Sequence, residues 1–144
     1  MALKQIDYGT KEYKEMLNLR NEILRKPLGI TFSAEELEKD KEDILIAFFD
    51  EDEILGCCIL TKMDNHTLRL RQMAVQKNLQ GKGIGDSIMT FAENLARDKG
   101  YKTLMMHARD TVLGFYEKFG YQIKGNQFFE LNNTPHHIME KALR

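Results

Sequence analysis

The chain has 144 residues, of which 42% are hydrophobic and 30% charged, as is usual for a water-soluble globular protein. This length favours one domain, which we expect to span residues 1–144. The net charge of −1 gives no basic footprint for nucleic acid, and no apolar run approaches the roughly 18 residues of a membrane span. Met1–Asp7 lacks the apolar core of a signal peptide, so we expect a cytoplasmic location.

The N-terminal part predicts one strand and two helices. A short strand is expected at Leu3–Ile6, and a helix over Thr10–Leu24, where apolar residues recur at helical spacing. A short acidic helix is expected over Ser33–Asp40, because Ser33 and Glu36 have the spacing of a capping box.

Three strands follow, at Ile44–Phe49, Ile54–Met63 and Thr67–Val75, separated by short polar turns. This order predicts an antiparallel meander. Cys57 and Cys58 are adjacent in the second strand, so their side chains should point to opposite faces. They have neither metal-ligand spacing nor the pattern of a disulfide framework, so we interpret them as buried thiols and predict no metal site.

A loop of small residues separates the third strand of the meander from the next helix. Gly81, Gly83 and Gly85 stand at alternate positions, and helical spacing runs from Ile84 to the turn before Gly100. Free N–H groups and the positive end of the helix dipole favour a bound anion at such a helix start. The loop is therefore interpreted as a cradle for a diphosphate, with an ordinary glycine-containing turn as the alternative.

Two well-known phosphate motifs do not fit this loop. Gly83 follows Lys82 where a P-loop needs Ser or Thr, and Asp86 stands where a dinucleotide fingerprint needs its third glycine. The spacing Gln80-x-x-Gly83-x-Gly85 instead resembles the acetyl-CoA pyrophosphate loop of the GNAT (Gcn5-related) N-acetyltransferase superfamily.

The C-terminal part predicts a strand, a helix capped by Asp110, and further strands. The first strand is expected at Thr103–Ala108, the helix at Thr111–Phe119 and the last strand at His137–Leu143. Between them, Tyr121–Lys124 starts a strand, which Gln127–Leu131 either continues or follows as a bulged segment.

A second motif lies on the predicted helix of this region. Gly114–Tyr121 reads Gly-Phe-Tyr-Glu-Lys-Phe-Gly-Tyr and resembles the GNAT segment that follows the fifth strand. Phe128-x-Glu130 and Pro135-His136-x-x-Met139 are similar to the C-terminus of small bacterial GNAT proteins of unassigned substrate. The resemblance implies an α+β, three-layer GNAT fold. Its mixed, mostly antiparallel sheet has about seven strands, is flanked by about four helices, and is splayed between strands 4 and 5.

The resemblance also implies acetyl-CoA as cosubstrate. Backbone groups of Met73 and Val75 would bond the pantetheine amides, and the N–H groups of the glycine loop would hold the pyrophosphate. The cofactor-binding residues expected on this basis are Met73, Ala74, Val75, Gln80, Gly81, Lys82, Gly83, Ile84, Gly85 and Tyr116.

The implied reaction is attack of a primary amine on the thioester carbonyl through a tetrahedral intermediate. Tyr116 matches the family's general-acid position, although the neighbouring aromatic residues also allow a core role. His136 is the candidate base, and His107, His137 and Glu130 are weaker candidates, each of which could instead be structural or a surface residue.

Arginines are candidates for shaping the acceptor site. By strand alternation, Arg69 and Arg71 share a face with Met73, where they could line a pocket or cover the sheet with solvated charge. Arg20 or Arg25 could bind a substrate carboxylate, or lie on the surface.

Two functions are consistent with this sequence. The first is an N-acetyltransferase acting on a primary amine of a small molecule or peptide. The second is a non-catalytic acyl-CoA-binding or sensing module, because residues 68–75 lack the glutamate that some relatives carry. An exposed last strand could also pair two copies into a homodimer.

Overall fold

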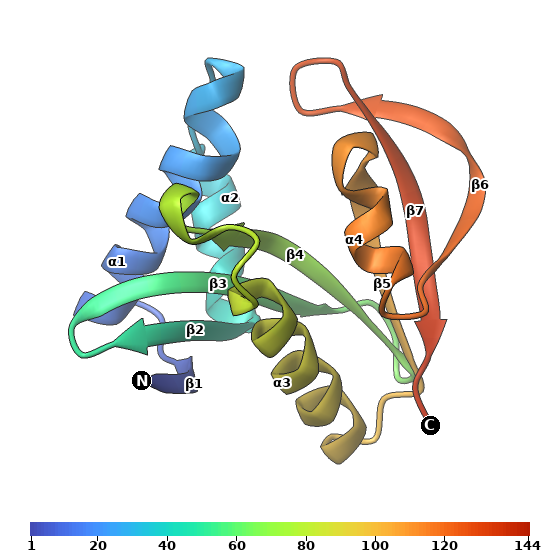
Figure 1. The fold of residues 1–144 in the computed structure, drawn as a ribbon, viewed down its shortest axis with the longest axis horizontal. Coiled ribbons are helices and arrows are strands. Elements are labelled where there is room, and N and C mark those ends of the chain that lie inside the picture. Colours follow the sequence, from blue (N-terminus) through green and yellow to red (C-terminus); the bar gives the residue numbers. More distant parts are fainter.

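The computed structural model describes all 144 residues as one seven-stranded sheet with helices on its two faces (Figure 1). The strands lie in the order β1-β2-β3-β4-β5-β7-β6. Their bounds are β1 (Ala2–Ile6), β2 (Ile44–Asp50), β3 (Glu53–Lys62), β4 (Thr67–Val75), β5 (Thr103–Arg109), β6 (Gln122–Glu130) and β7 (Thr134–Ala142). The helices are α1 (Lys11–Arg20), α2 (Ala34–Lys39), α3 (Ile84–Asp98) and α4 (Leu113–Glu117). None of them has the length and apolarity that a bilayer span needs.

The sheet opens between β4 and β5. These two strands are the parallel pair, and their pairing ends where Leu70 meets Met106. Residues 71–75 of β4 continue beyond that point without a partner on the β5 side, and β5 continues along β7 as far as the Arg109–His136 pair. Figure 1 shows the two strands diverging there. The predicted α+β fold, with its splay between the fourth and fifth strands, is confirmed.

Two apolar cores lie on opposite faces of the sheet. One packs against α3 and α4 and contains Cys58 and Tyr116, and the other packs against α1 and contains Cys57 and Met16. The prediction that the two cysteines point to opposite faces is therefore confirmed. Burial raises the pKa of the Cys57 thiol to about 12 and also raises that of Cys58, so both are protonated, inert core residues at neutral pH.

A β-bulge at Gln72 changes which residues of β4 face each side. Gln72 has a φ of 56°, and the register between β3 and β4 shifts beside it. Leu70 and Met73 both pack against the α3-side core, although they are an odd number of residues apart. Arg69 and Arg71 lie on the opposite face, so the prediction that they share a face with Met73 was wrong. Simple alternation fails because the bulge inserts one extra residue.

The helix starts agree with the sequence except at α4. Thr10 accepts a hydrogen bond from the Tyr13 amide at the start of α1, and Ser33 forms the predicted capping box at α2. The prediction that Asp110 caps the next helix was wrong, because Asp110 lies in a 3₁₀ turn and α4 begins at Leu113 without a side-chain cap. Its carboxylate instead accepts hydrogen bonds from side chains of the last two strands.

The last strand begins earlier than predicted. β7 starts at Thr134 rather than at His137, so His136 is a strand residue that pairs with Phe128 of β6 and Arg109 of β5. This pairing fixes the backbone of His136 within the sheet rather than in a turn. Because β7 lies between β5 and β6, the expectation of an exposed last strand was wrong.

Candidate acetyl-transfer site

A cleft of about 800 Å³ opens where β4 and β5 separate. The loop after β4, the start of α3, and α4 line one end of it. Side chains of β4, β5, β7 and the π-helical turn η1 (Asn21–Arg25) line the other end. The gap in the sheet thus joins a space on the α3 face to a space on the α1 face.

The loop before α3 presents free backbone donors to this cleft. The amide N–H groups of residues 80–86 donate to no backbone or side-chain acceptor of the protein, and the first bond of the α3 ladder runs from the Ser87 amide to the Gly83 carbonyl. Gly81 and Gly83 have φ values of 80° and 88°, which favour glycine and turn the chain so that successive amides are exposed. With the positive end of the α3 dipole added, this loop fits a pyrophosphate group.

The predicted loop residues differ in how they reach the cleft. Gln80, Gly81, Gly83 and Gly85 line it directly. The Lys82 side chain is exposed to solvent and the Ile84 side chain packs against the α3-side core, so these two residues offer only their amides.

Gly85 brings three elements together at the mouth of the cleft. A Cβ atom at this position would lie 3.1 Å from Cζ of Phe115 on α4 and 3.8 Å from Cγ2 of Val75 on β4. The first turn of α3 therefore packs closely on both neighbours only because residue 85 lacks a side chain.

The unpaired end of β4 forms one wall. Met73, Ala74 and Val75 all line the cleft, in the segment that has no partner strand on the β5 side. A free strand edge can hydrogen-bond an extended ligand as if it were another strand. The assignment of Met73 and Val75 to the pantetheine amides stays a prediction.

Tyr116 belongs to the core and to the cleft at once. It is 5% exposed, and its ring meets those of Phe115 and Tyr121 edge-on. The hydroxyl makes no hydrogen bond to another protein group, although the residue lines the cleft. Burial raises the pKa of Tyr116, so the phenol is protonated at neutral pH and has a free hydrogen to donate.

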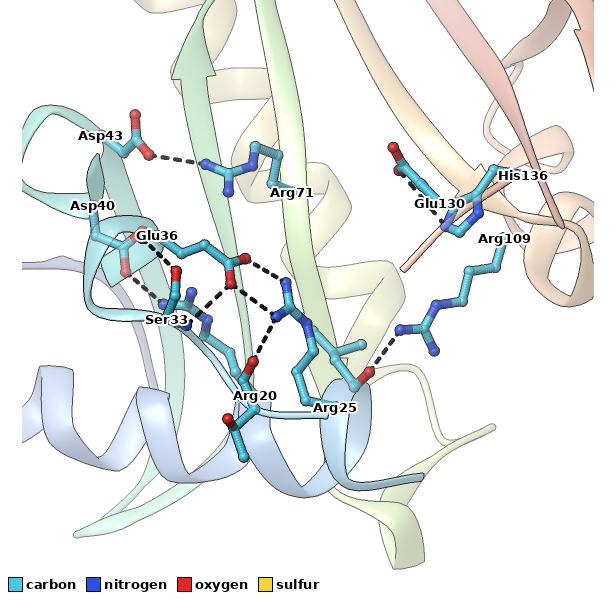
Figure 2. Close-up of polar contacts among 12 residues, drawn as sticks. Arg20, Arg25, Ser33, Glu36, Asp40, Asp43, Arg71, Arg109, Glu130 and His136 are labelled. Carbon is cyan, nitrogen blue, oxygen red and sulfur yellow. Dashed lines mark hydrogen bonds and ion pairs between the residues drawn. The ribbon is translucent and has the colours of Figure 1, made fainter. Parts of the chain in front are cut away.

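His136 has one ring nitrogen committed and one free. It is 1% exposed, and its Nδ1 lies 2.8 Å from the Thr134 carbonyl oxygen, which can only accept a hydrogen bond. In the neutral ring the proton therefore sits on Nδ1, and Nε2 is the basic nitrogen. Nε2 lies 3.8 Å from the Glu130 carboxylate, and Figure 2 shows the two side chains next to each other.

Glu130 connects two histidines. Its Oε1 atom is also 3.2 Å from Nδ1 of His107. The pKa of His107 is lowered by burial and by the nearby Arg69, effects that Glu130 partly offsets. His107, Glu130 and His136 were separate candidates in the sequence, and in the structure all three line the cleft. His137 does not join them, because its ring bonds Asp110 at 2.7 Å outside the cleft.

Two of the predicted acceptor arginines are already neutralised. Arg20 is 1% exposed, lies 2.9 Å from Asp40, and does not line the cleft. Arg25 lines the cleft but makes a bidentate contact with Glu36, with bonds of 2.7 and 3.2 Å. Neither side chain has the free charge that was expected for binding a substrate carboxylate.

Residues 40–123, more than half of the chain, match the family described as "Acetyltransferase (GNAT) domain". The chain belongs to the GNAT acetyltransferase family. The family is one of acyl-group transferases, and membership confirms the resemblance predicted from the glycine loop and the Tyr116 helix.

Curated relatives of the GNAT chain are known from Bacillus subtilis (strain 168). The uncharacterized protein YyaT is 32% identical over 78 residues, which cover 54% of this chain and 52% of the relative. The uncharacterized N-acetyltransferase YjcF is 26% identical over 133 residues, covering 91% and 93%. This chain covers between 42% and 52% of the length of the first three curated relatives, so it spans about half of each.

A solved structure of the same fold carries coenzyme A. The aminoglycoside 6′-N-acetyltransferase complexed with coenzyme A superposes with a TM-score of 0.83 over 100% of this chain and 98% of its own. At 21% sequence identity this likeness shows the fold alone.

Proposed function

We propose that this GNAT protein transfers an acetyl group from acetyl-CoA to a primary amine of a small molecule or peptide. The observation that carries the proposal is one cleft with two different ends. Free amides and a protonated phenol line the end on the α3 face, and a histidine–carboxylate cluster lines the end on the α1 face.

In this proposal acetyl-CoA binds from the α3 face. The amides of residues 80–86 hold its pyrophosphate, and the free edge of β4 at Met73 and Val75 holds the pantetheine arm. The thioester then lies in the gap between β4 and β5, where the amine meets it from the opposite face.

The amine must lose a proton before it attacks. An alkylamine has a pKa of about 10.4 and is mostly protonated at neutral pH. Nε2 of His136 takes this proton, directly or through water, and the Glu130 carboxylate stabilises the resulting imidazolium. The nitrogen lone pair then forms a bond to the thioester carbon, while the carbonyl electrons move onto oxygen near the Met73 amide.

Collapse of the tetrahedral intermediate releases the thiol. The carbonyl re-forms, the carbon–sulfur bond breaks, and the electron pair leaves on sulfur. Tyr116 donates its free hydrogen to the sulfur as negative charge develops there. The attacking nitrogen loses its second proton through water, which re-protonates the phenolate, and the proton on His136 is released to solvent. The products are an N-acetylated amine and CoA.

The test is thiol release from acetyl-CoA, measured with a panel of amines, amino acids, polyamines and peptides. Calorimetric binding of CoA is measured in parallel. Amine-dependent thiol release supports acetyl transfer. CoA binding without release for any acceptor would contradict it and favour the non-catalytic acyl-CoA-binding or sensing module.

A further inference from the structure

The acceptor end of the cleft holds four arginines, of which two are neutralised. Arg25 is paired with Glu36, and Arg71 lies 3.3 Å from the Asp43 carboxylate (Figure 2). Arg69 and Arg109 also line the cleft, but neither is within 4.0 Å of a carboxylate. Two guanidinium groups therefore remain without a counter-ion.

Both free guanidinium groups are partly withdrawn from water. Arg109 donates one hydrogen bond, of 2.7 Å, to the Leu24 carbonyl, and Figure 2 shows its guanidinium extending from the His136 side of the cleft toward η1. Nε of Arg69 is buried and has no acceptor. Burial lowers the pKa of both side chains, which reflects the cost of a charge that is desolvated without an ionic partner. An anion bound to either guanidinium group would offset that cost.

The two arginines flank the proposed reaction centre. Arg69 of β4 pairs with Met105 of β5, and His107 and Arg109 follow on the same face of β5 because side chains alternate. His107 therefore lies between the two arginines along the strand, with Glu130 against its ring. Glu130 is thus close to Arg69 and His107. It lines the same cleft as Arg109, and it forms no ion pair within 4.0 Å with either arginine.

We infer that the acceptor is a primary amine that also carries a carboxylate, which is bound by Arg69 and Arg109 while its ammonium group lies beside Glu130. The inference rests on the proposed acetyl transfer and names its class of acceptor. A polycationic amine is disfavoured, because it would place additional positive charge against two uncompensated guanidinium groups. A carboxylate on the acceptor supplies the counter-ion that both guanidinium groups lack, while Glu130 lies against the two histidines.

The experiment compares amines that differ only in the carboxylate. The pairs are lysine with cadaverine, histidine with histamine, and tyrosine with tyramine, and spermidine and O-phosphoethanolamine are added. We expect kcat/KM to be about 10- to 100-fold higher for the carboxylated member of at least one pair. Equal values within every pair would overturn the inference, as would a preference for spermidine or for O-phosphoethanolamine.

Arg69→Met and Arg109→Met test the two side chains separately. Each should lower kcat/KM for the carboxylated amine by about 10-fold or more, with little change for its decarboxylated partner or in the KM for acetyl-CoA. Arg97→Met is the matched control, since Arg97 lies on α3 outside the cleft. An equal fall in kcat/KM for both members of a pair would show that the arginines do not bind the carboxylate.

Calorimetry separates failure of this inference from failure of acetyl transfer. If CoA binds but no amine releases thiol, the reaction is wrong, and the carboxylate site is then tested by titrating the CoA-bound protein with the same pairs. Tighter binding of the carboxylated member, lost in Arg69→Met and Arg109→Met, supports the site. Equal or undetectable binding of both members overturns it.

Discussion

Tyr116 shows how one side chain can serve packing and chemistry together. Its ring is held by aromatic neighbours in the α3-side core, while its hydroxyl has no protein partner and faces the cleft. If the hydroxyl had no role, phenylalanine would pack equally well at this position, because the two rings have nearly the same shape.

Tyr116→Phe should therefore leave the fold and CoA affinity intact while lowering kcat by about 100-fold, the scale of a lost general acid. Thiol-release kinetics at saturating amine and calorimetry with CoA measure the two effects. Unchanged turnover would remove the acid role from Tyr116.

His107 and His136 both lie beside Glu130, so substituting each in turn compares them as candidates for the general base. His136 has its Nδ1 fixed by the Thr134 carbonyl, whereas Nδ1 of His107 faces Glu130. If Nε2 of His136 is the base, His136→Gln should lower kcat/KM by about 100-fold in the thiol-release assay, the scale of a lost general base. His107→Gln should cause a smaller loss. The reverse ranking would assign the base to His107.

At the scale of elements, the position of α3 on the sheet depends on Gly56 of β3. A Cβ atom there would lie 2.7 Å from Cδ1 of Ile88 and 3.1 Å from the Ala74 carbonyl oxygen. The isoleucine end can move, but the backbone oxygen of β4 cannot move without shifting the strand that lines the cleft.

Gly56→Ala should lower the free energy of unfolding by about 1–3 kcal/mol, as overpacking does, and should also weaken CoA binding. Gly114→Ala is the control, because a Cβ atom at that α4 position meets nothing within 4 Å. The control should be neutral or more stable by up to about 1 kcal/mol, since alanine favours the helix. Urea unfolding and CoA calorimetry measure both variants, and equal stabilities would contradict the packing argument.

At the scale of the whole molecule, an ion pair joins α2 to the turn that follows α1. Arg25 of η1 binds Glu36 of α2 through two hydrogen bonds, which hold the pKa of Glu36 at about 2. An unfolded glutamate titrates near pH 4.3, so the folded state binds the proton less readily than the unfolded state does. The stabilisation is complete above about pH 4.3 and is lost as the pH falls toward 2.

The melting temperature should therefore fall between about pH 4.3 and pH 2, and Glu36→Gln should flatten that part of the curve. Circular dichroism melts of both proteins across this range make the comparison. Parallel curves would show that the pair contributes nothing measurable. At neutral pH the variant should be less stable than the parent, because Arg25 is buried and would lose its counter-ion.

Sequence by itself determined the features that are encoded locally. The spacing of Gln80, Gly83 and Gly85 indicated a pyrophosphate loop, and the motif around Tyr116 indicated the family, because both depend on residues adjacent in the chain. Helix caps at Thr10 and Ser33 were predicted correctly for the same reason.

Only the tertiary structure decided which distant residues meet. The bulge at Gln72 placed Arg69 and Met73 on opposite faces of the sheet. Pairing of β7 with β5 and β6 brought His136 next to Glu130. Whether an arginine is free or neutralised depends on carboxylates from other elements. Arg25, for example, is neutralised by Glu36 of α2. Such pairings cannot be predicted from neighbouring residues in the sequence, because they form only when strands and helices pack together.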